Sequence, residues 1–297
     1  MFANIRGALT LLSYIFFTTF IFIFLMLVAI LKLLVPIGSF RKVSGRLIDG
    51  LASTCWVFCA NMTHRLLTRT RFKVHGLAEI KLNRWCLLLS NHQTWVDILV
   101  LIRVFFRKLP PYKFFIKKEL LWMPMMGIAF LALDFPIMKR YSKAFIKKNP
   151  HLKGQDLEVT RQACEKFKTQ PVTIMTFPEG TRFTDEKYKK QQSPYRHLLK
   201  PRAGGTALVL YAMGDMLEQI LDVTIVYPHG VPGLWDYFCG RTPEIIVDIR
   251  RLRVSPDLVG NYFADPDFRG DFRKWLNAFW AEKDTRIDHY LDGHYLK

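Results

Sequence analysis

Residues 87–100 read LLLSNHQTWVDILV, and this stretch decides the fold. Its leucines belong to a short apolar run of the kind that forms a buried strand. Polar residues from Ser90 to Thr94 interrupt the run, and a second apolar run with Asp97 inside it follows. An α-helix would place His92 and Asp97 about 140° apart at 3.6 residues per turn, so the two cannot share one helix face. The pattern therefore predicts a strand, a turn and then a helix whose first turn carries Asp97.

This turn would place His92 at the carboxyl end of a strand, where open α/β sheets hold their ligands. If Thr94 caps the helix, Asp97 can reach back to the imidazole. We then expect His92 to act as a general base, with Asp97 fixing its tautomer and stabilising the imidazolium. The alternative is a capping box formed by Thr94 and Asp97, with no task for the histidine. The same spacing at His151 and Asp156 lacks a preceding apolar strand, and we interpret it as coincidence.

Short apolar stretches alternate with amphipathic helices from Phe72 onward, which predicts an α/β domain. The last helix carries an apolar stripe that favours packing on the domain core, with lipid contact as the alternative. That stripe consists of Phe272, Trp275, Leu276, Phe279 and Trp280. We expect strands near residues 85–90, 113–117, 131–138, 172–177, 222–227 and 244–249, and helices near 95–106, 155–169, 206–220 and 269–283.

The N-terminal part of the chain is expected to attach the protein to a membrane. Residues 8–31 carry no charge, and as a helix they would extend roughly 36 Å at about 1.5 Å per residue, enough to cross a bilayer. More positive charges follow this run than precede it, which predicts a cytoplasmic catalytic domain. A second apolar helix over residues 47–67 leaves a shallow hairpin in one leaflet as the alternative. We divide the chain into anchoring helices over residues 1–70 and an α/β domain over residues 71–297.

The composition narrows the possible partners. The chain has 43 Lys and Arg residues against 25 Asp and Glu, a net charge of +18, and half of its residues are hydrophobic. This combination argues against a nucleic-acid partner and favours an anionic membrane and phosphorylated substrates. The five cysteines show no paired spacing, so we expect neither a disulfide framework nor a metal site.

A second polar turn follows a predicted strand in PVTIMTFPEGTRF, residues 171–183. Gly180 would let the backbone approach a ligand closely, and Arg182 offers a planar fork suited to phosphate oxygens. Glu179 could hold Arg182 or a substrate hydroxyl. The alternative is a polar turn with a surface ion pair.

A segment over residues 120–135 is more hydrophobic than a soluble enzyme needs. It is expected either in the core or partly on the membrane surface. Lys118 and Arg140 flank it, a placement that suits an anionic head group.

Together these motifs resemble those of the membrane-bound glycerolipid acyltransferases, the 1-acylglycerol-3-phosphate acyltransferase family. The blocks occur in family order between residues 74 and 230. The first block, NHQTWVD at 91–97, matches the NHxxxxD motif of the family. The second runs from Lys118 through Gly127 and ends near Arg140. The third is FPEGTR at 177–182 and the fourth is VTIVYP at 223–228.

The resemblance implies a mixed sheet with helices on both faces and acyl transfer from acyl-CoA or acyl-carrier protein to the hydroxyl of a lysophospholipid. His92 would deprotonate that hydroxyl and Asp97 would orient the base. The substrate-binding set would be Glu179, Gly180, Thr181, Arg182, Lys118 and Arg140. No cofactor, metal or covalent intermediate is implied.

Lysophosphatidic acid is the first expected acceptor. A long basic insertion before Gly204 departs from the family pattern and leaves another lysophospholipid as the alternative. A bacterial inner membrane is the first expected location, and an organelle membrane facing the cytosol is the second.

Two other functions are possible alternatives for this sequence. A lipid hydrolase could use Ser90, although the chain has no GxSxG nucleophile motif. A non-catalytic protein that binds anionic lipid or nucleic acid would explain the positive charge, but not FPEGTR or the placement of His92.

Overall fold

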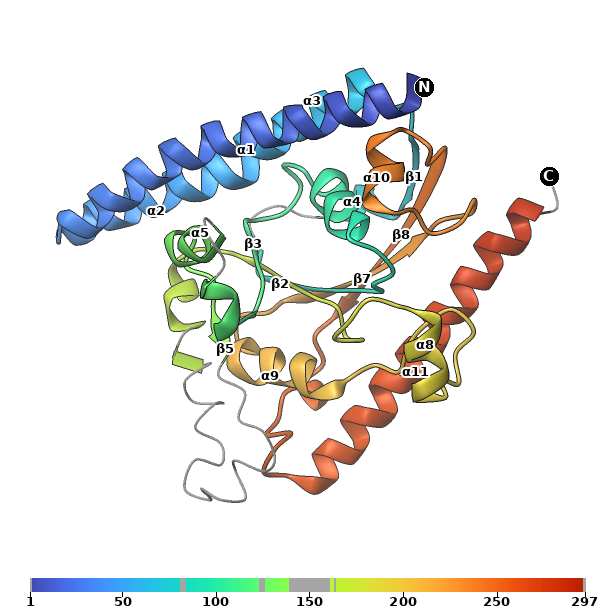
Figure 1. Ribbon diagram of the computed structural model, residues 1–297. Helices are drawn as coiled ribbons and strands as arrows, with labels where there is room; N and C mark the ends of the chain where they lie inside the picture. The colour runs from blue at the N-terminus through green and yellow to red at the C-terminus, as the bar shows by residue number, and fades with distance from the viewer. Residues whose placement is uncertain (1, 81–83, 123–125, 139–160, 163, 296–297) are drawn as a thin grey trace.

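The protein was analysed as a computed structural model, whose centre is a six-stranded sheet with the strand order β1-β8-β7-β2-β6-β3 (Figure 1). β7 and β8 pair antiparallel, and every other neighbouring pair in this sheet is parallel. The predicted α/β fold with a mixed central sheet is therefore confirmed. The strands are β1 Arg71–His75, β2 Cys86–Ser90, β3 Tyr112–Lys113, β6 Thr173–Thr176, β7 Gln219–Val226 and β8 Glu244–Arg253. The structure describes residues 2–80, 84–122, 126–138, 161–162 and 164–295.

Helices cover both faces of the sheet, and β2 contributes side chains to both. Leu87 and Leu89 lie in a core cluster with α9 and α11, whereas Cys86 and Leu88 lie in a second cluster with α4 and α10. A strand buried on both faces shows a continuous apolar run rather than alternation, which explains the pattern at residues 86–89. These helices are α4 Val96–Val104, α9 Ala203–Met213, α10 Leu234–Phe238 and α11 Pro266–Tyr295.

The apolar stripe on α11 packs on the core, as predicted. Phe272, Leu276 and Trp280 are almost completely buried in the cluster shared with α9. Near the middle of α11, Lys283 pairs with Asp222 of β7, an ion pair that leaves neither buried charge without a partner. The helix is therefore held to the sheet by both apolar and ionic contacts.

The strand expected over residues 131–138 is mostly wrong. Helix α5 (Met126–Ala132) occupies its start, and only β5 (Ile137–Met138) is extended, paired with β4 (Ile116–Lys117) in a separate small sheet. Asp134 ends the helix with a φ of 55°, while the Phe135 amide donates to the Phe130 carbonyl at 2.9 Å, the pattern of a helix C-terminal motif. A short apolar run does not distinguish helix from strand.

Other boundaries also differ from expectation. The helix expected over residues 206–220 ends at Met213, because β7 begins at Gln219. The strand expected over residues 113–117 is divided between β3 and β4, and β1 was not expected at all. Of the helix expected over residues 155–169, the described residues 161, 162 and 164–169 are helical, the last four as a 3₁₀ helix, and the others lie outside the described residues.

The N-terminal region forms a helical hairpin (Figure 1). Its first arm is long and apolar enough to cross a membrane, by length and composition alone. Its second arm runs back along the first as one continuous helix with a π-helical centre. The first arm is α1 Phe2–Leu34, and the second comprises α2 Gly38–Gly50, a π-helix at Leu51–Trp56 and α3 Val57–Leu67.

Both ends of α1 are held to the α/β domain. Near its start, the Thr10 hydroxyl donates to the Phe238 carbonyl at 3.2 Å. Near its end, Lys32 pairs with Asp134 at 2.8 Å. The division between residues 70 and 71 falls in the loop before β1, but the hairpin packs along the domain, so two separate domains remain a prediction.

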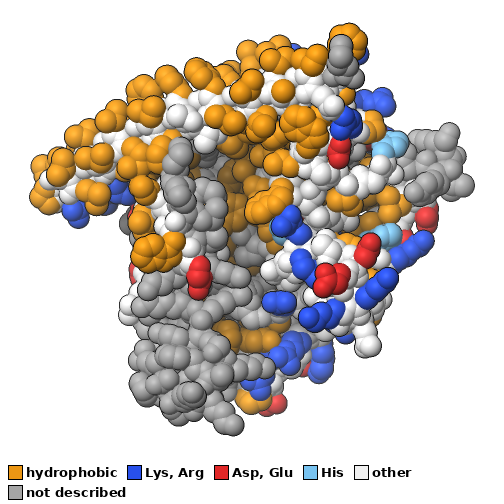
Figure 2. Space-filling model, viewed as in Figure 1, with side chains coloured by type: hydrophobic (Ala, Val, Ile, Leu, Met, Phe, Trp, Pro, Cys, Tyr) orange, Lys and Arg blue, Asp and Glu red, His pale blue; other side chains and the backbone are white. Residues whose placement is uncertain are grey.

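Hydrophobic side chains are exposed along the hairpin and the neighbouring α5 region (Figure 2). Trp122 is 85 % exposed, and Ile128 and Leu131 of α5 are exposed as well. This agrees with the interpretation of residues 120–135 as partly a surface segment, because α5 packs beside α1.

Candidate active site

The turn between β2 and α4 brings His92 and Asp97 together as predicted. β2 ends at Ser90 and α4 begins at Val96, so Asp97 lies in the first helical turn. His92 Nδ1 lies 2.8 Å from Asp97 Oδ2. The imidazole is 12 % exposed and Asp97 is buried. The pair therefore leaves Nε2 available for a ligand while Nδ1 is bound.

Asp97 accepts four hydrogen bonds. Besides the imidazole, its Oδ2 accepts from the backbone amides of Gln93 at 2.6 Å and Thr94 at 2.9 Å, and its Oδ1 accepts from the Tyr227 hydroxyl at 2.6 Å. The bond from the Thr94 amide is half of a capping box, so Asp97 caps the helix as well as contacting the imidazole, and its catalytic role stays a prediction. Burial, and then the charge of Asp97, raise the pKa of Tyr227 well above its usual value, which keeps its hydroxyl a donor.

The histidine loop is fixed from several sides. The Asn91 side chain exchanges two hydrogen bonds with the backbone of Ile225, at 2.9 and 2.8 Å, and the Thr94 hydroxyl donates to the Pro232 carbonyl at 2.8 Å. Phe177, just beyond β6, stacks on the His92 ring with 4.0 Å between centroids. The orientation of the imidazole is thus set by neighbours on three other segments.

The FPEGTR turn lies beside the histidine loop. β2 and β6 are parallel neighbours, so their carboxyl ends meet at one edge of the sheet. The His92 amide donates to Glu179 Oε1 at 2.8 Å, and the Phe183 amide donates to the His92 carbonyl at 2.8 Å. The predicted convergence of the two motifs is therefore present in the fold.

The Glu179 carboxylate accepts hydrogen bonds from two backbone amides, and its expected role in holding Arg182 or a substrate hydroxyl stays a prediction. Its side chain is fully buried, and its second oxygen accepts from the Leu199 amide at 3.0 Å. Burial raises the pKa of this carboxyl to about 8. Glu179 ties the histidine loop to the loop that carries Leu199, because each of its oxygens is occupied by a backbone amide.

Arg182 is exposed at the same edge of the sheet. Its guanidinium carbon lies 4.5 Å from the centroid of the Trp95 ring, a cation–π arrangement that holds the arginine beside the histidine loop. Gly180 has a φ of 68°, which favours glycine. Thr181 accepts a hydrogen bond from Lys187 of α8 (Asp185–Gln191) at 2.8 Å, so a further cation lies next to the turn.

The remaining candidates are placed less directly. Arg140 and the copy of the motif at His151 and Asp156 lie outside the described residues, as does the side chain of Lys118. Ser90 is buried and its hydroxyl donates to the Asn91 carbonyl at 3.1 Å, which argues against the hydrolase reading. Within the described ranges, no cluster of three metal-ligating side chains occurs.

Comparison with known proteins agrees with this geometry. The family model described as Acyltransferase matches residues 71–228, which include both turns. The chain belongs to the acyltransferase family. This confirms the predicted resemblance at the level of the family.

The acyltransferase is also similar to individual curated proteins. It is 27 % identical over 224 residues to "Probable 1-acyl-sn-glycerol-3-phosphate acyltransferase 5" of Arabidopsis thaliana, which covers 70 % of this chain and 54 % of that protein. It is 23 % identical over 288 residues to "1-acyl-sn-glycerol-3-phosphate acyltransferase epsilon" of Mus musculus, covering 89 % and 72 %. The chain thus spans about half the length of the plant relative. Both relatives are eukaryotic, so the bacterial branch stays a prediction.

A solved structure has a similar fold. The crystal structure of the 1-acyl-sn-glycerophosphate (LPA) acyltransferase PlsC from Thermotoga maritima matches the acyltransferase with a TM-score of 0.51 and 19 % identity, over 96 % of this chain and 98 % of that one. The match confirms the mixed α/β architecture and the N-terminal apolar helix as features of a known fold.

Sequence reasoning missed three residues of the acyltransferase site. Tyr227 lies in the VTIVYP block, but nothing local indicates that its hydroxyl reaches Asp97. Phe177 opens FPEGTR, and its proximity to the imidazole depends on the pairing of β2 with β6. Lys187 belongs to the basic insertion, where a run of charges is usually solvated.

Proposed function

We propose that this acyltransferase moves a fatty acyl group from an acyl thioester to the free hydroxyl of a lysophospholipid, with lysophosphatidic acid as the first acceptor. One observation carries the proposal: an oriented imidazole with a free nitrogen lies at the same sheet edge as an exposed guanidinium. The imidazole suits a hydroxyl that must lose a proton, and the guanidinium suits a phosphate.

The proposed reaction needs one base and no covalent enzyme intermediate. With Nδ1 donating to Asp97, His92 Nε2 takes the proton of the acceptor hydroxyl as its oxygen attacks the thioester carbonyl. The carbon–oxygen bond forms, the carbon–sulfur bond breaks, and the proton passes from the imidazolium to the departing thiolate. Asp97 stabilises the imidazolium in between, because a buried carboxylate interacts strongly with a charge that it contacts.

Arg182, with Thr181 and Gly180 in the same turn, is assigned to the acceptor phosphate in this proposal. The role of Glu179 is to position the two loops, because its oxygens are already occupied. Lys118 and Arg140 stay candidates for the head group on the family motif alone. The names of the plant and mouse relatives support lysophosphatidic acid, and another lysophospholipid remains the alternative acceptor.

We place α1 in one leaflet rather than across the bilayer. The amide oxygen of Asn4 accepts from Arg241 at 2.6 Å, while Lys32 at the other end pairs with Asp134. If α1 crossed the bilayer, its two ends would lie on opposite sides of a hydrocarbon layer about 30 Å thick. Both ends instead contact the same α/β domain, which lies on one side. Epitopes placed before Phe2 and after Leu34 should then be digested from the same side of sealed vesicles, and digestion from opposite sides would establish a span.

The cellular membrane and the side that carries the catalytic domain are also part of this proposal. The net charge of +18 favours the cytoplasmic leaflet, because the anionic lipids of that leaflet attract basic protein surfaces. Of the two predicted locations, the eukaryotic origin of the relatives favours an organelle membrane over a bacterial inner membrane. Imaging of the tagged protein in its own cell decides between them.

The experiment that tests the activity is product analysis. Detergent-solubilised protein is incubated with lysophosphatidic acid or other lysophospholipids, and with either acyl-CoA or acyl-carrier protein. Mass spectrometry should detect phosphatidic acid as the main product. Release of free fatty acid without any diacyl product would contradict acyl transfer and favour hydrolysis.

A further inference from the structure

A small pocket lies where the second arm of the hairpin meets the α/β domain. It is lined by the end of α2, the start of the π-helix and the loop that joins α4 to β3, and Figure 1 shows this loop extending toward the hairpin. Its volume is about 260 Å³, below the roughly 300 to 1,000 Å³ of sites for drug-sized ligands. An ion or a lipid head group therefore suits the pocket better than a larger molecule.

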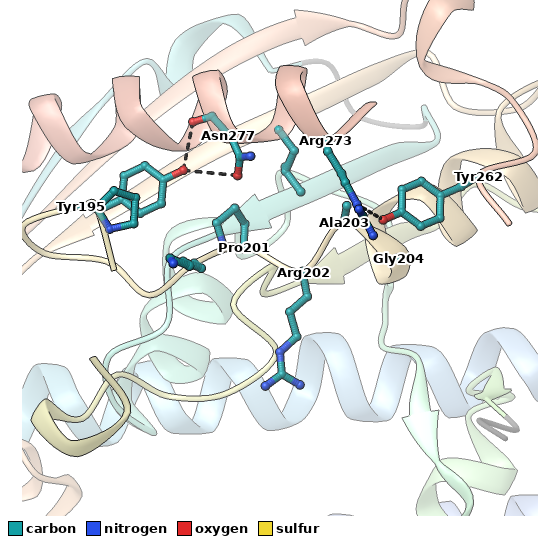
Figure 3. Close-up of a pocket in the computed structure, with 11 residues that line it drawn as sticks. Tyr195, Pro201, Arg202, Ala203, Gly204, Tyr262, Arg273 and Asn277 are labelled. Atoms are coloured by element: carbon teal, nitrogen blue, oxygen red, sulfur yellow. Dashed lines mark hydrogen bonds between the residues drawn. The ribbon is translucent and has the colours of Figure 1, made fainter. Parts of the chain in front are cut away.

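The pocket and the catalytic site lie at opposite edges of the sheet. Tyr112 and Gln170, which line the pocket, lie at the start of β3 and just before β6, whereas the His92 loop and the FPEGTR turn follow the carboxyl ends of β2 and β6. A larger basic cavity of about 630 Å³, drawn in Figure 3, is lined by Arg202 beside the FPEGTR turn and so belongs to the catalytic edge. The pocket at the amino edge is therefore a separate site.

The pocket carries uncompensated positive charge. Arg46 of α2 and Arg107 of the loop before β3 both line it and are exposed. Among the described residues, neither guanidinium has a hydrogen-bond or ion-pair partner. Asp49 is the one acid among the lining residues, all of which the structure describes, and its Oδ1 accepts from Lys113 Nζ at 2.7 Å. Because Lys113 neutralises Asp49, the two arginines remain free to attract an anion.

The backbone around the pocket is unusual on both sides. Arg107 has a φ of 56°, a conformation that costs free energy for residues other than glycine and is concentrated at functional sites. On the opposite wall, Ser53 and Thr54 belong to the π-helix, and π-helical turns also occur frequently at functional sites. Folding alone gains nothing from an arginine at position 107, so its side chain is expected to have another role.

The walls of the pocket are fixed by contacts with the sheet. The Thr173 hydroxyl donates to the Pro110 carbonyl at 3.0 Å, and the Thr173 amide donates to the Pro111 carbonyl at 2.9 Å. Lys113 of β3 donates to the Leu133 carbonyl as well as to Asp49, which holds α2 against the domain. A preformed site loses less entropy when a ligand binds.

The side of α2 that carries Arg46 is next to lipid. Val43, one turn before Arg46, and Leu47, directly after it, are exposed. In a hairpin that lies in one leaflet, these apolar side chains contact acyl chains while the neighbouring arginine reaches the head-group level. A phosphate can therefore enter the pocket while the chains attached to it stay beside Val43 and Leu47.

We propose that this pocket binds the phosphate of an anionic phospholipid from the leaflet that holds the hairpin. Arg46 belongs to the hairpin and Arg107 to the α/β domain, so the bound lipid joins the two parts. A choline head group would add a cation beside two arginines, which makes phosphatidylcholine a poor ligand. The inference rests on the placement of the hairpin in the membrane and does not depend on acyl transfer.

The binding test uses the full chain in neutral detergent micelles. Native mass spectrometry should show that dioleoylphosphatidylglycerol binds more tightly than dioleoylphosphatidylcholine. Arg46→Gln and Arg107→Gln should each weaken the binding of phosphatidylglycerol about tenfold, the usual size of one charge-assisted hydrogen bond. Arg41→Gln and Lys108→Gln are the matched controls, because Arg41 and Lys108 are exposed on the same two segments without lining the pocket. Both controls should keep the affinity of the unmodified protein.

Arg107→Gly separates binding from folding. It removes the charge and also the cost of the left-handed backbone, so it should bind phosphatidylglycerol about tenfold more weakly, with a Tm in lipid-free detergent that is equal or higher. A lower Tm with unchanged lipid affinity would show that Arg107 is structural and would overturn the proposal.

Four other results would also overturn it: equal binding of the two phospholipids, equal binding of inorganic phosphate and phosphatidylglycerol, equal affinity in all four glutamine variants, or a loss of affinity in Arg182→Gln instead. The last result would place the lipid at the catalytic edge. None of these results would contradict the proposed acyl transfer, which is measured separately from its products.

Discussion

The two sides of the site are held in opposite ways. On the imidazole side, Asp97 is buried and accepts four hydrogen bonds, and the His92 ring is stacked on Phe177. On the guanidinium side, Arg182 is exposed and rests on Trp95, which is itself 54 % exposed. Proton transfer requires a fixed geometry. An arginine without a bound anion is more stable in contact with water, because burying an unpaired charge costs several kcal/mol.

The largest effect on turnover is expected from removing the imidazole of His92. His92→Ala should lower kcat by about 10² to 10⁴, the usual contribution of a general base, with little change in thermal stability. His289→Ala, on the exposed surface of α11, provides a matched control. Unchanged turnover in the His92 variant would remove the base from the mechanism.

The buried carboxyl of Glu179, which joins the two loops, should make the stability of the fold depend on pH. The folded protein keeps the Glu179 proton up to about pH 8, while the unfolded chain releases it near 4.5. The protonated carboxyl contributes its full stabilisation below the unfolded pKa of 4.5, and this stabilisation is lost as the pH rises toward the folded pKa of about 8. The loss amounts to a few kcal/mol, at roughly 1.4 kcal/mol per pKa unit. Glu179→Gln should therefore flatten the decline in Tm between about pH 4.5 and 8.

Parallel Tm curves for the two proteins would show that Glu179 ionises normally. Glu282→Gln is the control, because Glu282 is exposed on α11 and its replacement should leave the pH dependence as it is in the unmodified protein.

The solvated side should affect binding more than turnover. Arg182→Gln should raise the KM for lysophosphatidic acid about 10- to 100-fold, because it removes charge-assisted hydrogen bonds to the phosphate. Arg182→Lys keeps the charge and loses the planar fork, so an intermediate KM is expected. Steady-state kinetics over a range of acceptor concentrations measure the KM of both variants. A decrease in kcat without a change in KM would indicate that Arg182 acts in catalysis and does not bind the phosphate.

The smallest effect is expected at Tyr227, which acts on the base through Asp97. Tyr227→Phe deletes one of the four hydrogen bonds to the carboxylate and should lower kcat about tenfold. With one donor fewer, the carboxylate should pair more strongly with the imidazolium. The acidic limb of the pH–rate profile, along which the base loses its proton, should therefore shift to higher pH. A merely structural tyrosine would lower Tm without moving that profile.

The local part of the site could be predicted from the sequence. His92 and Asp97 are five residues apart, and a strand followed by a helix leaves one geometry in which they meet. The convergence of this turn with FPEGTR also followed, because both motifs come after apolar strands whose carboxyl ends share an edge. The role of Glu179 could not be predicted, since its two amide donors come from His92 and Leu199 on separate loops.

The sequence by itself determined the elements with strong local signals: the buried strand before His92, the turn with its imidazole and carboxylate, and the apolar stripe of α11. Tertiary structure alone decided that Tyr227, 130 residues beyond Asp97, completes the base, that Glu179 is enclosed, and that a basic cavity forms beside Arg202. The reason is that periodicity reports which side of an element is apolar, while strand order and loop packing determine which distant donors and acceptors become neighbours.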